Sequence, residues 1–350
     1  MRRPLFLTLT GGALLAFALL ASLIGTTPPL TSAQALLRQM PGLDGYKIYF
    51  TEANQEASRF DRSGAGISRY AGLLRSLGAE LFTLEWRNGI PDDADLLVIP
   101  GPRADLTADQ VARLWAYVDG GGRVLLMVDP LDARGAPGRA LPAAQGFFLL
   151  SWADVGLRAR DDVVGIEGER VNGEAGTLVT RFTTDTFRAE HPILRGIEGP
   201  LAFGTARSLD VDSAIQVYNV QTLVNTSTDF YGETAYPRFL TEGVLEYNIG
   251  TDTGRAALPL AAVAERSSTG ARIVLISDLD FATNGYGLET SPAYSASFIY
   301  PDNARFMLNA TTWLLGMESF IAQEFPTPAP TGTPTITPSP TPTATATPSS

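Results

Sequence analysis

The chain has 350 residues, a net formal charge of −11, no cysteine and a single histidine, His191. It is long enough to bury a full core as one large domain or two ordinary ones. The lack of cysteine excludes disulfides, thiolate metal sites and a cysteine nucleophile, and one histidine excludes the usual multi-histidine zinc sites. The excess of 37 acidic over 26 basic residues argues against a nucleic-acid-binding protein.

An apolar stretch near the N-terminus predicts a membrane segment. Arg2 and Arg3 precede the uncharged run from Leu5 to Ile24, which is about the 20 residues that a helix needs to span a bilayer. We predict residues 1–33 as an anchor in the cell membrane, with the rest of the chain on the extracytoplasmic side. The alternative is a signal peptide cleaved near Ala33, which would give a secreted protein.

Strand-like and helix-like segments alternate over residues 45–318. The run Leu96-Leu97-Val98-Ile99 is typical of a strand covered on both faces, and Thr107 is a good helix N-cap. We predict strands at 46–50, 81–86, 95–99, 123–128 and 271–277, and helices at 67–77, 107–118 and 303–315. This order predicts an α/β domain of three layers, with a mostly parallel sheet and helices on both faces.

The other parts of the chain are less regular. Within 147–270 we predict short strands at 177–182, 214–220 and 258–264, and we interpret this region as an elaboration of the same sheet. Residues 325–350 consist largely of Pro, Thr, Ser and Ala, which predicts a disordered, extended tail.

Three segments together resemble the class I glutamine-amidotransferase-like fold, which is related to flavodoxin-like sheets. They read ADLLVIPGP from Ala94, GGGRVLLMVDP from Gly120 and GARIVLISDLDF from Gly270. The turn EHPILRGI from Glu190 and the segment LNATTWL from Leu308 also fit. More narrowly, the set is similar to the non-catalytic extracytoplasmic versions, namely the DUF4350 type and the auxiliary component of gliding-type ABC transport systems.

The resemblance implies an accessory role without catalysis. Catalytic relatives place a cysteine after the strand that here ends at Val128-Asp129, and this chain has no cysteine. We therefore expect no enzyme activity and no cofactor, and we expect ABC permease or ATPase subunits as partners. Two alternatives stay open: a cell-surface protein whose tail spaces it from cell-wall glycan, and an extracellular hydrolase.

The candidate site residues follow buried strands or lie in an aromatic-rich loop. Asp129, Asp278 and Asp280 come where open α/β sheets bind ligands, and the hydrolase alternative would use these carboxylates. Their other interpretation is that they cap turns through backbone N–H groups. Three tyrosines are candidates for a partner or ligand surface: Tyr286, Tyr294 and Tyr300. We assign no metal site, and we interpret His191 as a structural turn residue.

Overall fold

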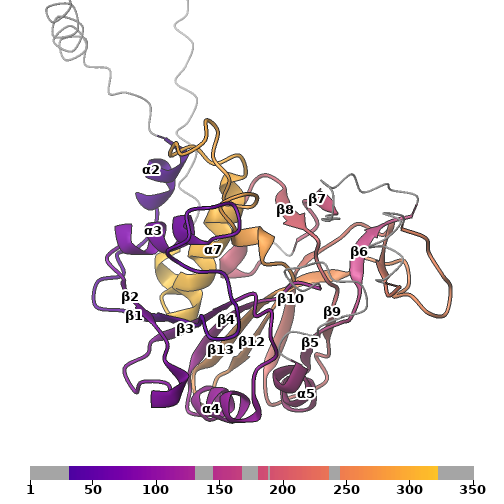
Figure 1. Cartoon of the computed structure of the whole chain (residues 1–350), viewed down its shortest axis with the longest axis horizontal. Coiled ribbons are helices and arrows are strands. Elements are labelled where there is room, and N and C mark those ends of the chain that lie inside the picture. Colours follow the sequence, from indigo (N-terminus) through magenta and orange to yellow (C-terminus); the bar gives the residue numbers. More distant parts are fainter. Residues whose placement is uncertain (1–30, 131–144, 168–179, 188–189, 236–244, 322–350) are drawn as a thin grey trace, which may run out of the picture.

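The computed structural model describes residues 31–130, 145–167, 180–187, 190–235 and 245–321. Its centre is a seven-stranded sheet in the order β10-β12-β13-β4-β3-β1-β2 (Figure 1). The strands are β1 (Lys47–Phe50), β2 (Glu80–Thr83), β3 (Leu96–Pro100), β4 (Arg123–Met127), β10 (Asn219–Asn225), β12 (Pro259–Arg266) and β13 (Ala271–Ile276). Four of its pairings are parallel, and β12 is antiparallel to both of its neighbours.

Helices cover both faces of this sheet, as the sequence predicts (Figure 1). One face carries α2 (Ser32–Leu37), α3 (Ser68–Ser76) and α7 (Pro301–Leu314), and the other carries α4 (Ala108–Asp119) and α5 (Gln145–Asp154). Alternate residues of β3 belong to the two cores: Leu96 and Val98 pack in the α3–α7 layer, and Leu97 and Ile99 in the α4–α5 layer. This double burial explains why β3 reads as a continuous apolar run.

The predicted ends of α4 are confirmed. Thr107 and Gln110 form a capping box at its start, which satisfies two backbone N–H groups that the first turn leaves unpaired. At its end Gly121 has a φ of 97° and a side chain there would meet the carbonyl oxygen of Thr269. The glycine triplet 120–122 therefore ends the helix and leads into β4, as its composition indicates.

Residues between β4 and β12 form three further antiparallel sheets of two strands each. They pair β5 (Leu157–Ala159) with β9 (Leu209–Val211), β6 (Val163–Ile166) with β11 (Phe230–Glu233), and β7 (Arg181–Thr184) with β8 (Leu201–Gly204). Short 3₁₀ helices lie at Trp86–Asn88, Pro192–Leu194, Asp280–Ala282 and Glu318–Phe320. We refer to the described parts of residues 145–258, without β10, as the insert region.

Some boundaries differ from the predictions. The strand predicted over 81–86 ends at Thr83, and Trp86 begins a 3₁₀ turn. The strand predicted over 214–220 lies later, at β10. The first half of the strand predicted over 177–182 falls outside the described residues, and its end overlaps β7. In the described ranges, no helix is both long and apolar enough to cross a membrane. The predicted anchor (1–33) lies almost wholly outside those ranges, and the predicted tail (325–350) wholly so.

Candidate functional site

The ends of β4 and β13 bring the three predicted aspartates to one edge of the sheet. These strands are parallel neighbours, with Met127 paired to Ile276, and Asp129 and Asp278 each follow two residues later. Asp280 begins the next 3₁₀ turn. Ligands of open α/β sheets bind outside this carboxyl edge, so the position matches the sequence prediction.

Each carboxylate accepts a hydrogen bond from a turn beside it. Asp129 accepts from the backbone N–H of Leu279 at 2.7 Å. Asp278 is fully buried and accepts from the N–H groups of Gly204 at 2.6 Å and Asp280 at 2.8 Å. These bonds fix the turns after β8 and β13, which is the capping role that strand-end aspartates often have. Binding of a ligand by these residues stays a prediction.

Burial and mutual repulsion disfavour the charged forms of this cluster. Burial, reinforced by the charge of Asp280, raises the pKa of Asp129 to about 7. The same two causes, together with Asp129, raise the pKa of Asp278 well above its ordinary value, and burial raises the pKa of Asp280. Arg103 and Arg207 act on Asp129 in the opposite direction. In each of the three carboxyls the protonated form is therefore favoured more than it is in an exposed aspartate.

Three neighbouring carboxylates could also bind a metal ion. Over the residues that the structure describes, no group of three or more acidic, histidine or cysteine side chains is placed to hold one. We therefore derive no chemistry from a cation at Asp129, Asp278 and Asp280.

Arg207 connects this edge of the sheet to a pocket. Its backbone N–H donates to the carbonyl of Ser277 at 2.9 Å, next to Asp278. Its side chain is only 1% exposed, its Nε donates to the backbone carbonyl of Arg160, and its Nη2 pairs with Asp161 at 2.5 Å. One buried cation of the insert region thus lies between the strand-end aspartates and the pocket.

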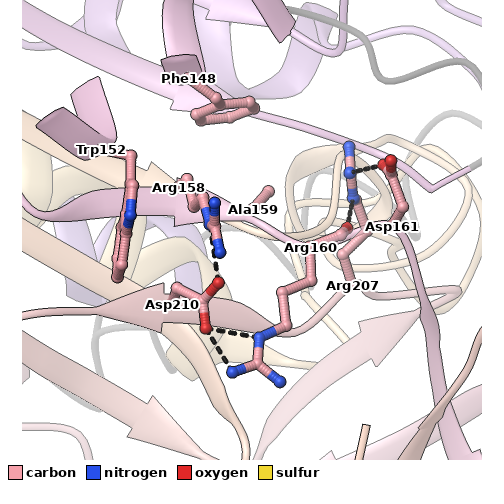
Figure 2. Close-up of a pocket in the computed structure, with 8 residues that line it drawn as sticks. All are labelled: Phe148, Trp152, Arg158, Ala159, Arg160, Asp161, Arg207 and Asp210. Carbon is pink, nitrogen blue, oxygen red and sulfur yellow. Dashed lines mark hydrogen bonds and ion pairs between the residues drawn. The ribbon is translucent and has the colours of Figure 1, made fainter. Parts of the chain in front are cut away.

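The pocket has a volume of about 400 Å³ (Figure 2), which is in the range of small-molecule sites. Its walls come from α5, β5, β9 and the turns beside them. Eight residues line it: Phe148, Trp152, Arg158, Ala159, Arg160, Asp161, Arg207 and Asp210. Because β5 and β9 pair antiparallel with Arg158 opposite Asp210, their side chains meet on one face of this small sheet.

Asp210 lies between two arginines of the pocket (Figure 2). It accepts from Nε of Arg158 at 2.7 Å and from Nε of Arg160 at 2.5 Å. The guanidinium of Arg158 also lies 4.3 Å from the ring centre of Trp152, within the range of a cation–π contact. Three arginines against two aspartates leave the lining with one excess positive charge, in a chain whose net charge is −11.

Comparison with known proteins identifies the family. The family described as an ABC-type uncharacterized transport system, ABC_transp_aux, matches residues 46–310. The chain belongs to this family. The match runs from the residue before β1 into α7, so it includes every strand of the main sheet, both aspartate-bearing turns and the pocket. It supports the predicted accessory association with ABC transport, while the DUF4350 and amidotransferase-like assignments stay predictions.

The other comparisons give only weak likenesses to known proteins. No curated protein matches the sequence. Among solved structures, the mmIFT52 N-terminal domain has 15% identity and a TM-score of 0.49, covering 77% of this chain and 96% of its own. A putative ThuA-like protein from Bacteroides uniformis has 11% identity and a TM-score of 0.42, covering 78% and 92%. Both scores are below 0.5, and no conclusion about this chain depends on them.

The predicted tyrosine surface is reduced to one strongly exposed side chain. Tyr294 is 86% exposed, whereas Tyr286 is 5% exposed and packs its ring against Tyr300 at 5.6 Å. Tyr286 is therefore a buried residue, whose ring contacts Tyr300 and the guanidinium of Arg181. His191 accepts from the backbone N–H of Ile193 at 3.3 Å through Nδ1, as expected of a turn residue.

The pocket has little signature in the amino-acid sequence. Its charged residues come from segments about 50 positions apart, because Arg158 and Arg160 are on one strand edge and Asp210 is on its partner. The only local signal was the alternation Arg158-Ala159-Arg160, which places two arginines on the same face of a strand.

Proposed function

We propose that this protein is a non-enzymatic accessory domain, anchored in the cell membrane and exposed on its extracytoplasmic side, that works with an ABC-type transport system. The observation that carries the proposal is the family match over residues 46–310. We expect its partners to be the permease or ATPase subunits of that system.

The N-terminal sequence and the helix after it support a retained anchor. The apolar run ends at Ile24, and α2 begins soon afterwards at Ser32 with Thr31 and Gln34 as its capping box. The backbone N–H of Ala33 donates to the carbonyl of Ala296 at 3.0 Å, and Leu36 is buried. Cleavage near Ala33 would cut this docked helix in its first turn, so the packing favours the anchor over the cleaved signal.

The described side chains support a role in binding. The single histidine caps a turn, and the chain has no cysteine. The hydrolase alternative needs carboxylates that reach substrate. Of its three candidates, Asp278 is fully buried and both of its oxygens accept backbone hydrogen bonds, so it is not free to act on a substrate. An accessory domain requires a stable scaffold and a surface or pocket, both of which this fold provides.

Co-purification tests the proposal. The full chain with a C-terminal tag is isolated from gently solubilised membranes of its native host, and bound proteins are identified by mass spectrometry. We expect ABC permease or ATPase subunits, together with an N-terminal mass that retains residues 1–33. The control replaces residues 1–30 with a cleavable signal peptide, which should release the domain from the membrane. Recovery of the protein alone, or of a natural form that starts at Gln34, would contradict the proposal.

The lack of cysteine allows a clean test of location. Ile249 is 88% exposed, so Ile249→Cys provides a single reactive thiol. We expect a membrane-impermeant maleimide to label this variant in intact cells. Leu125→Cys, at a fully buried position, is the control that should stay unlabelled. Labelling of Ile249→Cys only after lysis would contradict the extracytoplasmic location.

A further inference from the structure

We propose that the pocket beside Arg207 binds a small molecule through an oxyanion group, a phosphate or a carboxylate, with the rest of the molecule against an aromatic wall. This site goes beyond the accessory role and does not depend on it.

The first support is the arrangement of hydrogen-bond donors. A guanidinium has five N–H donors. Asp210 accepts from the Nε atoms of Arg158 and Arg160 and pairs with Nη2 of Arg160. Within the described ranges, both Nη atoms of Arg158 and Nη1 of Arg160 have no hydrogen-bond partner. Asp210 therefore holds the two arginines in place and leaves donors for an acceptor-rich ligand.

The second support is Arg207. This side chain is 1% exposed, and its Nη1 atom is buried with no hydrogen-bond partner among the described residues. Buried polar groups are almost always paired, and an unpaired charged donor is costly. Arg207 lines the same pocket as Arg158 and Arg160. An oxyanion that enters among the three guanidiniums would complete the hydrogen bonding of this one.

The local charge also favours an anion. Both carboxylates of the lining are already paired with arginine, Asp210 with Arg158 and Arg160, and Asp161 with Arg207. The lining keeps one excess positive charge on a chain with net charge −11. Arginine is well suited to this task because its planar fork matches phosphate and carboxylate oxygens.

The aromatic wall indicates a ligand larger than a bare ion. Phe148 and Trp152 line the pocket beside the arginines (Figure 2). The volume of about 400 Å³ leaves room for a ring next to the charged group, and aromatic side chains bind the apolar faces of such rings. The chemistry that fits is a sugar phosphate or a sugar acid, which share an oxyanion on a ring.

The test compares each anionic sugar with the same sugar without its phosphate or carboxylate group. Glucose 6-phosphate is paired with glucose and galacturonate with galactose, and inorganic phosphate is added as the bare anion, all at constant ionic strength. Binding to the full chain is followed by calorimetry and by tryptophan fluorescence. Trp152 should dominate the change, because Trp86, Trp115 and Trp313 are buried. We expect saturable binding of an anionic sugar and none of its neutral counterpart. The anionic sugar that binds more tightly identifies phosphate or carboxylate as the preferred group.

Variants identify the site. Arg158 and Arg160 have side chains that are 44% and 41% exposed, so replacement by glutamine should leave the protein folded. We expect Arg158→Gln and Arg160→Gln each to weaken binding by about tenfold or more, because each removes charge-assisted hydrogen bonds. Arg113→Gln is the matched control, because it removes an arginine from a different cavity of about 610 Å³, and it should bind normally.

Three outcomes would overturn the inference: no saturable binding by any of the five probes, equal binding of neutral and anionic sugars, or equal weakening by Arg113→Gln. Trp152→Phe is a further variant that removes the fluorescence signal and leaves the three arginines in place. Calorimetry should still detect binding of an anionic sugar to this variant, which separates loss of binding from loss of the signal.

Discussion

The main sheet and the insert region are stabilised by different interactions. The side chains of β3 and β4 that face the helices are apolar and almost fully buried, so the hydrophobic effect dominates there. The insert region instead buries charged and polar groups, including Asp162, Arg207 and Ser208. Such groups are tolerated only when they are hydrogen-bonded.

This difference explains where the pocket lies. A sheet covered on both faces has no free side-chain positions for a ligand, whereas short sheets with polar interiors can direct charged side chains to one place. Asp162 illustrates the arrangement: it is fully buried and accepts from Ser208 N–H at 2.8 Å, from Ser208 Oγ at 2.5 Å and from Thr253 Oγ1 at 2.6 Å. The main sheet thus serves as the scaffold and the insert region as the binding part.

Removing apolar volume from the main sheet should have the largest effect on global stability. Leu125 is fully buried at the centre of β4, opposite Val98 and Val274 on the two neighbouring strands. We expect Leu125→Ala to lower the free energy of unfolding by about 2–5 kcal/mol, from lost burial and the cavity it leaves. Urea denaturation measures this change. Ile249→Ala, at an exposed site, should change stability by less than about 0.5 kcal/mol.

Removing Asp162 should loosen the insert region before the main sheet. Asp162→Ala leaves three donors of Ser208 and Thr253 unpaired, which we expect to cost about 3 kcal/mol. Hydrogen exchange should accelerate for amides of β6, β9 and β11, with β3 and β4 unchanged. Replacement of the exposed Asp92 by alanine is the control and should change neither. Equal acceleration in all five strands would show that the two regions unfold as one unit.

Much of the main sheet could be predicted from the sequence because its strands are buried on both faces. β3, β4 and β13 each read as an apolar run that leads into a turn. Strands at or near the edge of the sheet are harder to predict from the sequence. β2 pairs on one side only and ends at Thr83, and β10 contains Asn219, Gln221 and Thr222, which give no apolar alternation. The insert region pairs residues far apart in sequence, such as Leu157 with Val211, and no local pattern encodes that pairing.

The two candidate sites differ in the same way: the strand-end aspartates can be predicted from the sequence, and the pocket cannot. The sequence predicts Asp129, Asp278 and Asp280 because they follow buried strands, and the strand order places those strand ends together. The sequence does not predict the pocket arginines as a site, because their convergence with Asp210 depends on the β5–β9 pairing.

The aspartate edge, where the two regions meet, should make stability depend on pH. An unfolded aspartate releases its proton at about pH 4, and Asp129 in the folded protein does so at about 7. Between these values the folded state binds more protons, so stability falls as the pH rises. Asp129→Asn keeps an acceptor for Leu279 N–H and removes the charge. We expect it to stabilise the protein by up to about 4 kcal/mol at pH 8 and very little at pH 4.

Thermal unfolding of both proteins from pH 4 to 8 measures this dependence. Asp92→Asn, at an exposed position, serves as the control and should leave the pH slope unchanged. A slope that is the same with and without Asp129→Asn would mean that this carboxyl does not control the pH dependence.

The smallest expected effect concerns His191, which joins the insert region to α7. Its Nδ1 accepts from Ile193 N–H, and its ring packs edge-on against Trp313 of α7 at 5.3 Å. We expect His191→Ala to cost about 1 kcal/mol, the usual value of a lost cap. His191→Asn should recover part of that loss because its side-chain oxygen can accept the same bond. Both variants should bind anionic sugars normally, because His191 does not line the pocket. Loss of binding or of transporter partners in a stably folded His191→Asn would give the imidazole a function that its turn geometry does not require.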